Sequence, residues 1–367
     1  MDYKADVEQS QKRMEAWWHR DIVDRVVVQL AAPRRPAAAA APPHSEAPDR
    51  EPPTRADLER YFLDPAVVIP NLKRRLANTW FGGEAFPVMF PVSIQMVAVL
   101  ANYLGCPLRF VTKDTTWHDP IIDDPNGLPR LSLDPENPVW KASLRLLEAA
   151  TAESDGYFVG CPDLNGPTEI LGLMRGHEEF AMDFHDQPGY IRPALEEITN
   201  TWYECWKQTA GIAHRAGGWF FWMGIWSENP AIDLQSDVSC LISKEAFDEH
   251  FLPSIERQTR MVARTIYHLD GPGAIRHLDS LLALPRLDAI QWVQGAGGGS
   301  VLDYVPLLKR IQAAKKLIYC YSEKSELEEL LGQLGPEGLY IVVQDCTSPE
   351  EGREILRSVG KWTRLRG

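Results

Sequence analysis

The sequence predicts an α/β protein that folds as a single (β/α)8 TIM barrel over residues 1–367. Eight short apolar runs with Gly or Pro at their edges alternate with longer stretches of helical spacing, and such alternation is typical of a parallel sheet. The last four strand–helix units follow one another at intervals of roughly 25 residues, as expected for repeated βα units. A hydrophobic content of 44% suffices for one large core. An open doubly wound sheet is the alternative architecture.

The predicted strands are rich in β-branched and aromatic residues, the types that favour extended backbone. They cover residues 26–30, 87–92, 157–162, 219–226, 265–270, 289–293, 317–322 and 339–345. The predicted helices have apolar residues at helical spacing. They include residues 138–152, 189–216, 244–263, 274–284, 304–314, 327–334 and 349–359. Because the strands extend from residue 26 to residue 345, they leave no room for a second core.

A Pro/Ala-rich segment, residues 34–55, follows the first predicted strand. It holds five consecutive alanines, and six prolines at positions 36, 42, 43, 48, 52 and 53. Proline lacks a backbone N–H and breaks both helices and central strands. We therefore expect this segment to be a flexible loop inserted into the barrel.

The composition excludes several classes of partner and location. Lysine and arginine number 38 against 51 acidic residues, so the net charge of −13 disfavours nucleic acid as a ligand. The polar first 25 residues do not resemble a signal peptide, and no apolar run reaches the ~18 residues of a membrane span. We expect a cytoplasmic protein whose six cysteines, without a CxxC pair, are reduced thiols. The oligomeric state stays open.

The strongest site candidate is the sequence His268-Leu-Asp270 at the end of the fifth predicted strand. Residues i and i+2 of a strand face the same side, so both side chains point into the barrel mouth, where active sites of this fold lie. Cys346, after the eighth strand, is a candidate third ligand that leaves one position open, as in catalytic zinc sites. A hydrogen-bonded His–Asp pair that orients a substrate without a metal is the alternative.

Other polar and aromatic side chains follow or end the predicted strands, where a barrel collects its functional groups. Asp163, Glu228 and Gln291 are candidate catalytic groups, with Glu228 a general acid/base or a metal ligand. Aromatic residues there could wall a ligand pocket. The candidate substrate-binding residues are Asn165, Trp226, Asp237, Trp292 and Tyr321.

Three stretches together resemble the uroporphyrinogen decarboxylase superfamily, whose other branch comprises corrinoid- and zinc-dependent methyltransferases. They are DLNGPTEILGLMRGHEEFAMDFHDQP, SDVSCLISKEAFDEHFLPSIERQTR and YHLDGPGAIRHLDSLLALPRLDAIQWVQGAG, at residues 163–188, 236–260 and 267–297. The resemblance covers almost the whole chain after the Pro/Ala-rich segment and rests on the order of the stretches. It implies a (β/α)8 barrel.

Departures from the family motifs narrow what the resemblance implies. Decarboxylases of the superfamily carry an arginine motif resembling MRQAGR, whereas LAAPRRP stands here, with Arg34 and Arg35. This disfavours decarboxylation of a porphyrinogen. The methyltransferases bind zinc through an HxC motif and a later cysteine. Here Asp270 stands at the first cysteine position and Cys346 near the second. An oxygen ligand in place of sulfur makes the site harder.

The resemblance thus implies a metal-dependent methyltransferase that acts on a small organic substrate, with His268, Asp270 and Cys346 holding zinc or another divalent metal. A corrinoid would have to arrive on a partner protein, because the chain lacks a DxHxxG corrinoid-binding motif. One alternative is a metal-free decarboxylase or lyase that uses Asp163 and the His268–Asp270 pair as acid/base groups. Another is a protein that binds a corrinoid or tetrapyrrole-like ligand without chemistry.

Overall fold

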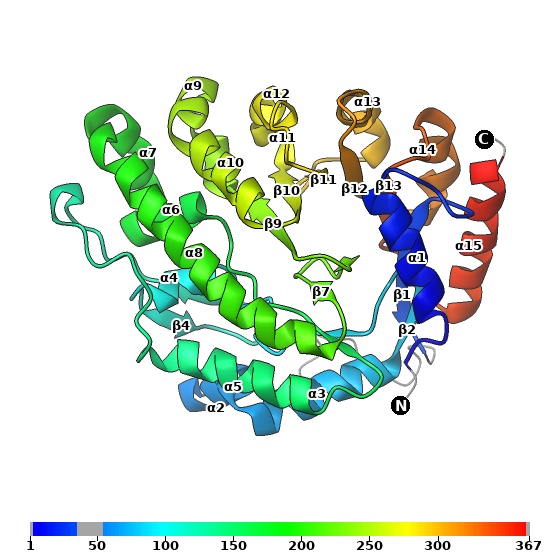
Figure 1. The fold of residues 1–367 in the computed structure, drawn as a ribbon, viewed down its shortest axis with the longest axis horizontal. Helices are drawn as coiled ribbons and strands as arrows, with labels where there is room; N and C mark the ends of the chain where they lie inside the picture. Colours follow the sequence, from blue (N-terminus) through cyan, green and yellow to red (C-terminus); the bar gives the residue numbers. More distant parts are fainter. Residues whose placement is uncertain (1–2, 35–53, 365–367) are drawn as a thin grey trace.

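The computed structural model describes residues 3–34 and 54–364. It is a mixed α/β fold built on a large, mainly parallel sheet with helices outside it (Figure 1). Most of the predicted Pro/Ala-rich loop, residues 35–53, lies outside the described residues. Within the described ranges, no helix is long and apolar enough to cross a membrane. All six cysteines are free thiols.

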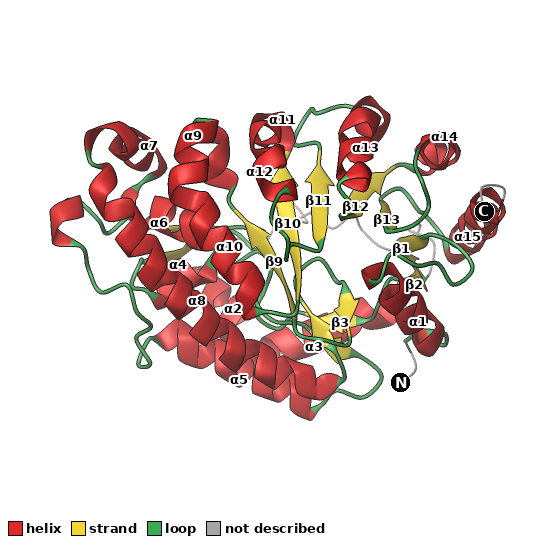
Figure 2. Ribbon diagram, turned by 45° about the horizontal axis from the view of Figure 1, so that its top comes forward, coloured by secondary structure: helices red, strands yellow, loops and turns green. Residues whose placement is uncertain are grey.

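Seven strands form the main sheet, which curves so that its strands lie along an arc (Figure 2). Neighbouring strands are parallel except for the first pair, which is antiparallel. The first long strand of the chain therefore pairs with the last one. In sheet order the strands are β2 (Thr79–Gly83), β1 (Val27–Pro33), β13 (Leu339–Val343), β12 (Leu317–Ser322), β11 (Ala289–Val293), β10 (Arg264–Asp270) and β9 (Ala231–Gln235).

Six further strands form three short pairs. One pair is parallel and two are antiparallel, and all have two or three residues per strand. The parallel pair is β3 (Val88–Met89) with β6 (Phe158–Val159); the antiparallel pairs are β4 (Leu108–Phe110) with β5 (Thr116–His118), and β7 (Trp219–Phe220) with β8 (Trp226–Ser227).

The closed eight-stranded barrel that the sequence predicts is not formed by the strand ladders of the described residues, because two predicted strands are too short to join them. Pro87 and Pro91 flank β3, and a residue without a backbone N–H cannot extend a ladder. Gly156 before β6 has φ +75° and interrupts the extended chain. The two short strands β3 and β6 therefore pair only with each other, and the main sheet stays open with seven strands.

The aromatic run at residues 219–226 is a hairpin and not the single strand that the sequence predicts. The chain reverses between β7 and β8, and Gly224 in this turn has φ +73°, a conformation that favours glycine. The strand that joins the main sheet is β9, which the sequence analysis missed. Its sequence AIDLQ alternates apolar and polar residues, and Asp233 and Gln235 obscure the apolar signal.

Helices cover the outer side of the sheet and one of its ends (Figure 1). Local signals explain several starts: Thr54 and Asp57 form a capping box before α2, and Asn137 caps α5, which begins with proline. The helices are α1 (Val7–Trp18), α2 (Arg55–Leu63), α3 (Pro65–Asn78), α4 (Val99–Tyr103), α5 (Pro138–Ala152), α6 (Pro167–Arg175), α7 (His177–Asp186), α8 (Ile191–Ala213), α9 (Lys244–Ala246), α10 (Leu252–Met261), α11 (Gly271–Ala274), α12 (Leu278–Leu282), α13 (Val305–Ala313), α14 (Leu327–Gln333) and α15 (Pro349–Arg364).

Shorter helical turns connect these elements. A π-helical turn, Phe247–Phe251, lies between α9 and α10. The 3-10 turns are Pro125–Gly127, Pro188–Tyr190, His214–Ala216, Asp237–Leu241, Ile275–His277, Val301–Tyr304 and Lys324–Glu326.

A buried ion pair ties the amino-terminal segment to the sheet. Glu84, directly after β2, is fully buried and accepts hydrogen bonds from both Nη atoms of Arg25, at 2.8 and 2.9 Å. Its Oε2 also accepts from the backbone N–H of Val28 in β1, at 2.9 Å. Arg13 of α1 lies 3.3 Å from the same carboxylate. One carboxylate therefore joins α1, β1 and the end of β2.

Candidate metal and active site

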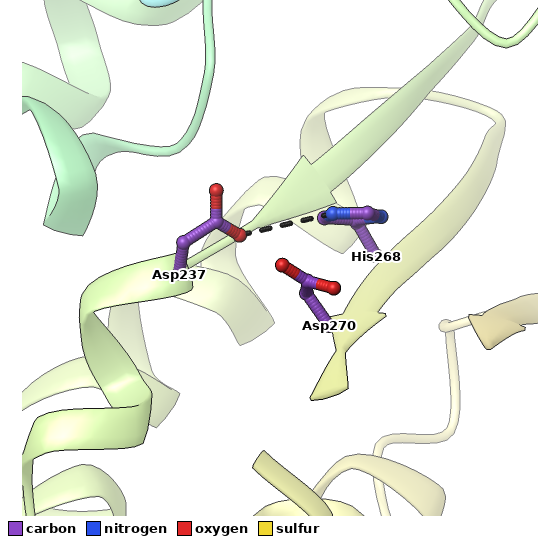
Figure 3. Close-up of side chains that lie close together, drawn as sticks. All are labelled: Asp237, His268 and Asp270. Carbon is purple, nitrogen blue, oxygen red and sulfur yellow. Dashed lines mark ion pairs between the residues drawn. The ribbon is translucent and has the colours of Figure 1, made fainter. Parts of the chain in front are cut away.

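The register of the sheet sets a row of polar side chains on its inner face. His268 of β10 pairs with Gln235 of β9 on one side and with Gln291 of β11 on the other. Residues in register on parallel strands point to the same face. Leu269, between His268 and Asp270, is fully buried. The side chains of His268 and Asp270 lie on one side of β10 (Figure 3).

Asp237 completes a cluster with His268 and Asp270 (Figure 3). It begins the 3-10 turn that follows β9, the neighbour of β10 in the sheet. Asp237 Oδ1 lies 3.8 Å from His268 Nε2, and one ligand atom from each of the three residues lies within 4.8 Å of the others. The sequence analysis assigned Asp237 to the substrate; the structure brings it to the predicted metal ligands.

The donor set and its surroundings fit a divalent cation. Asp237 Oδ1 is buried and has no hydrogen-bond partner among the described residues, and a buried oxygen without a partner is costly unless an ion satisfies it. One imidazole and two carboxylates are ligands that zinc and other first-row divalent ions accept. Asp270, the third candidate ligand, ends β10 and is partly exposed, so the cluster is open to solvent on its side.

Gln291 fixes the orientation of the His268 ring. Its Oε1 lies 2.5 Å from His268 Nδ1, and its Nε2 donates to the hydroxyl of Tyr321 at 3.0 Å. Because an amide oxygen only accepts, His268 donates from Nδ1, and Nε2 is the ring nitrogen that faces Asp237. Such a partner on the far nitrogen is usual for a metal-binding histidine. The indole of Trp222 packs edge-on against the same ring, with centroids 5.6 Å apart.

Buried carboxyl groups surround this cluster. Burial, together with the charge of Asp233, raises the pKa of Asp163 to about 8, so this carboxyl is largely protonated at neutral pH. Burial likewise raises the pKa of Asp233 and of Asp237 to about 6. The Oδ1 atom of Asp163 accepts from the backbone N–H of Asn165 and from Gln235 Nε2, both at 2.9 Å. The site thus combines a place for a cation with a proton donor.

Glu169 of α6 holds the turn that carries Asp237. Its Oε2 accepts the backbone N–H of Val238 at 2.8 Å, and its Oε1 lies 2.8 Å from His177 Nε2. This hydrogen bond raises the pKa of His177. The sequence analysis did not identify His177 or Gln235 as part of the site, because neither lies in a recognisable motif and only the sheet register and the packing of α6 bring them there.

Two cavities meet at Trp222. One, of about 800 Å³, is lined by His268, Asp270 and Tyr321 and is bordered by the glycine-rich segment 295–300. The other, of about 530 Å³, is largely apolar and is lined by side chains of β1, α3 and β3, with Gln95 and Arg75 among its few polar groups. Because Trp222 lines both, its indole stands between a polar space beside the candidate ligands and an apolar one.

Cys346 does not join the cluster. It lies beyond the end of β13, where Asp345 accepts the backbone N–H of Lys324 at 2.8 Å and fixes the course of the chain. The Cys346 thiol donates to the backbone oxygen of Ser348 at 3.4 Å and faces Gly352 of α15. Burial raises its pKa, which disfavours the thiolate that binds metals. In the structure, therefore, Asp237 and not Cys346 lies beside His268 and Asp270.

Three other predicted residues lie away from the cluster. Glu228 is exposed and directly follows β8, which is antiparallel to β7. Two residues later, the backbone oxygen of Pro230 accepts a hydrogen bond from the backbone N–H of Arg264, at the start of β10. This is the end of the sheet opposite His268. Trp226, on β8, is buried beside Gly218 at the same end. Trp292 is fully buried and packs on Tyr304, because it alternates with the inward-facing Gln291.

Comparison with known proteins gives a likeness of fold. No protein-family model matches the chain, and no curated protein sequence matches it. Among solved structures, a methyltransferase from Methanosarcina mazei superposes with a TM-score of 0.58 over 96% of this chain and 98% of that chain, at 12% sequence identity. At this identity the likeness establishes a shared fold, and it agrees with the mixed α/β architecture described above.

Proposed function

We propose that this protein is a metal-dependent methyltransferase of the uroporphyrinogen decarboxylase-like barrel class, acting on a small organic substrate. The observation that carries the proposal is the cluster of Asp237, His268 and Asp270 at the ends of adjacent parallel strands, with a buried Asp237 oxygen that has no hydrogen-bond partner among the described residues. The fold shared with a methyltransferase supports the same class of reaction. A corrinoid, if the reaction needs one, would come on a partner protein.

The chain's own residues then have distinct tasks. His268, Asp237 and Asp270 would hold zinc or another divalent ion, which supplies Lewis-acid activation of the substrate heteroatom when bound. Gln291 orients the imidazole. The apolar cavity beyond Trp222 has room for the organic part of a substrate whose polar end faces the cluster.

Asp163 would act as the proton donor of the reaction. Its carboxyl is fully enclosed beside the cluster, and its raised pKa of about 8 keeps a proton on it near neutral pH. This group can donate that proton to a leaving group. Asn165 and Gln235 hold it in place through the bonds described above.

Metal content tests the proposal directly. The purified protein should bind one zinc or other divalent ion per chain, measured by elemental analysis after dialysis. His268→Gln and Asp237→Asn should each lose the ion, because each removes a ligand, whereas Cys346→Ser should retain it. A wild-type protein without stoichiometric metal after loading, or a Cys346→Ser variant that loses it, would contradict the assignment.

A metal-free decarboxylase or lyase is the second candidate, and the protonated Asp163 beside a histidine and carboxylates favours it. In that case Asp163 protonates the carbon that loses its carboxyl group, and His268 with Asp237 orients the substrate. Chelators separate the two functions, because only the methyltransferase should lose activity on metal removal and regain it when zinc is restored.

A further inference from the structure

A third cavity, with two arginines in its lining, lies outside the sheet, between α8 and the segment formed by the π-helical turn and α10. Its volume is about 360 Å³. Polar residues from one face of each helix line it at helical spacing: Arg192, Glu196 and Thr199 from α8, and His250, Ser254 and Arg257 from the other segment. We call these six residues the α8–α10 groove.

The two guanidinium groups of the groove carry unneutralised charge. Neither Arg192 nor Arg257 has an ion-pair partner within the described part of the chain. Arg257 donates only to neutral oxygens, those of the Asn200 side chain at 2.5 Å and of the Glu196 backbone at 3.4 Å. Arg192 is the second residue of α8, where the helix dipole disfavours a cation. Although the chain as a whole carries a net charge of −13, these two arginines give the groove a local positive charge, and this local charge favours an anion.

His250 adds an unsatisfied donor at the same place. Its side chain is 8% exposed, and its Nδ1 is buried without a hydrogen-bond partner among the described residues. Burial lowers the pKa of the ring, which is therefore neutral and able to donate from one nitrogen. His250 sits on the π-helical turn, a rare conformation that is frequent at functional sites.

The neighbouring hydroxyl groups complete the lining. Thr199 donates to the backbone oxygen of Leu195 at 2.6 Å, and its oxygen lies 2.8 Å from the buried hydroxyl of Ser254. Because Thr199 donates its own proton to Leu195, the Ser254 hydroxyl donates to Thr199, its only partner within the described residues. Rotation of this hydroxyl would let it donate to a ligand instead. Two guanidinium groups, one imidazole and the Ser254 hydroxyl therefore line a single cavity. One carboxylate, that of Glu196, lines it as well and forms no ion pair with either arginine within the described residues, so the groove keeps an excess of positive charge.

We propose that the α8–α10 groove binds a small phosphate-bearing ligand, with Arg192 and Arg257 as the charged contacts and His250 and Ser254 as hydrogen-bond donors. Guanidinium groups match the geometry of phosphate oxygens, and both can take part because they lie on opposite walls of the groove. The cavity exceeds the size of a free phosphate ion, so a phosphomonoester is the form with the better fit. The site is separate from the metal cluster and does not depend on the proposed reaction.

Isothermal titration calorimetry in phosphate-free chloride buffer tests this inference, with inorganic phosphate and glycerol 3-phosphate as the two probes. Saturable binding of one molecule per chain is expected, and tighter binding of glycerol 3-phosphate would identify a phosphomonoester as the ligand form. Arg192→Gln and Arg257→Gln should each weaken binding by about tenfold or more. Arg260→Gln, on the same helix but paired with Glu256, is the matched control and should bind as the wild type does.

Three results would overturn the proposal: no saturable binding of either probe, unchanged affinity in the Arg192→Gln/Arg257→Gln double variant, or an equal loss in Arg260→Gln. Because both arginines reach the surface of the groove, the variants should fold, and unchanged thermal unfolding without ligand verifies this. His268→Gln should still bind the probes, so that failure of the metal assignment and failure of the anion site are distinguishable.

Discussion

At the scale of single residues, the candidate site depends on two side chains, Gln291 and Asp163, that are not among the candidate metal ligands. Gln291 is fully buried and links the hydroxyl of Tyr321 to His268, so one amide decides which imidazole nitrogen is free. Asp163 is enclosed near other carboxylates and keeps its proton because ionisation there is unfavourable. Both residues act through their environment, and both lead to measurable predictions.

Replacing Gln291 should weaken metal binding without removing a ligand. In Gln291→Leu, the acceptor for His268 Nδ1 is lost, the imidazole can rotate or change tautomer, and metal affinity should fall about 10- to 100-fold. Competition with a chromogenic chelator measures this. Tyr321→Phe is the control, because it removes only the outer hydroxyl and keeps the amide beside His268. Equal affinities of Gln291→Leu and the wild type would refute the orienting role.

Asp163 should make the metal-free protein less stable at alkaline pH. Its pKa is raised to about 8 in the folded protein, so the folded chain retains a proton that the unfolded chain releases near pH 4. The stability from this proton is complete at low pH and is lost as pH rises toward and through 8. Asp163→Asn, which mimics the protonated carboxyl, should be more stable than the wild type by ~2 kcal/mol or more at pH 9.

Urea denaturation of both proteins from pH 5 to pH 9, with a chelator present, gives the comparison. The advantage of Asp163→Asn should be small at pH 5 and should grow with pH. If the two free energies of unfolding keep a constant difference across this range, the carboxyl is ionised in the folded protein and the assignment of a proton to it is wrong.

At the scale of elements, the site is assembled where α6 begins against the end of β9. Gly166 precedes α6, and a Cβ atom placed on it would stand 1.7 Å from the backbone oxygen of Gln235. Its φ of −87° is ordinary, so the requirement for glycine is one of space alone. This close approach brings Asp163 and Glu169 to the turn that carries Asp237.

Gly166→Ala should therefore disturb both stability and the site. A clash between two backbone segments cannot be relieved by rotating a side chain, and we expect a loss of ~1–3 kcal/mol in the free energy of unfolding together with weaker metal binding. Gly211→Ala provides the control: this glycine lies in the exposed part of α8 with no neighbouring atom within 4 Å. It should be neutral or slightly stabilising, since alanine is the better helix former.

The sequence predicts those parts of the site that depend on a local pattern of residues, and it does not predict the parts that depend on how distant segments pack together. The pair His268 and Asp270 was predicted because strand period is local, and β10 to β13 were predicted because each is a strongly apolar run. Asp237 was predicted as a substrate-binding residue, and its place beside His268 and Asp270 was not foreseen because it depends on the pairing of β9 with β10. The strand β9 was missed, since Asp233 and Gln235 interrupt its apolar pattern. Cys346 was misplaced because sequence order does not fix where a loop after a strand turns.

At the scale of the whole molecule, Glu84 connects parts of the chain that are distant in sequence. Removing its charge leaves Arg25, which is 7% exposed, without a carboxylate partner. Glu84→Gln should cost ~3–5 kcal/mol of stability, the range for breaking one side of a buried ion pair. Thermal or urea unfolding measures the loss. Glu59→Gln, which breaks the exposed pair with Arg55, should cause no measurable change.

The pairing of β1 with β13 has a consequence for synthesis. Val27 lies beside Tyr340, so β1 cannot complete its parallel edge until the ribosome has added more than 300 further residues. At translation rates of about 5–20 residues per second, that delay is roughly 15–60 s. During this interval only the antiparallel neighbour β2 can cover β1, and its other edge remains open to wrong partners. Nascent chains of this protein should therefore depend on chaperones that recognise exposed strands near the amino terminus.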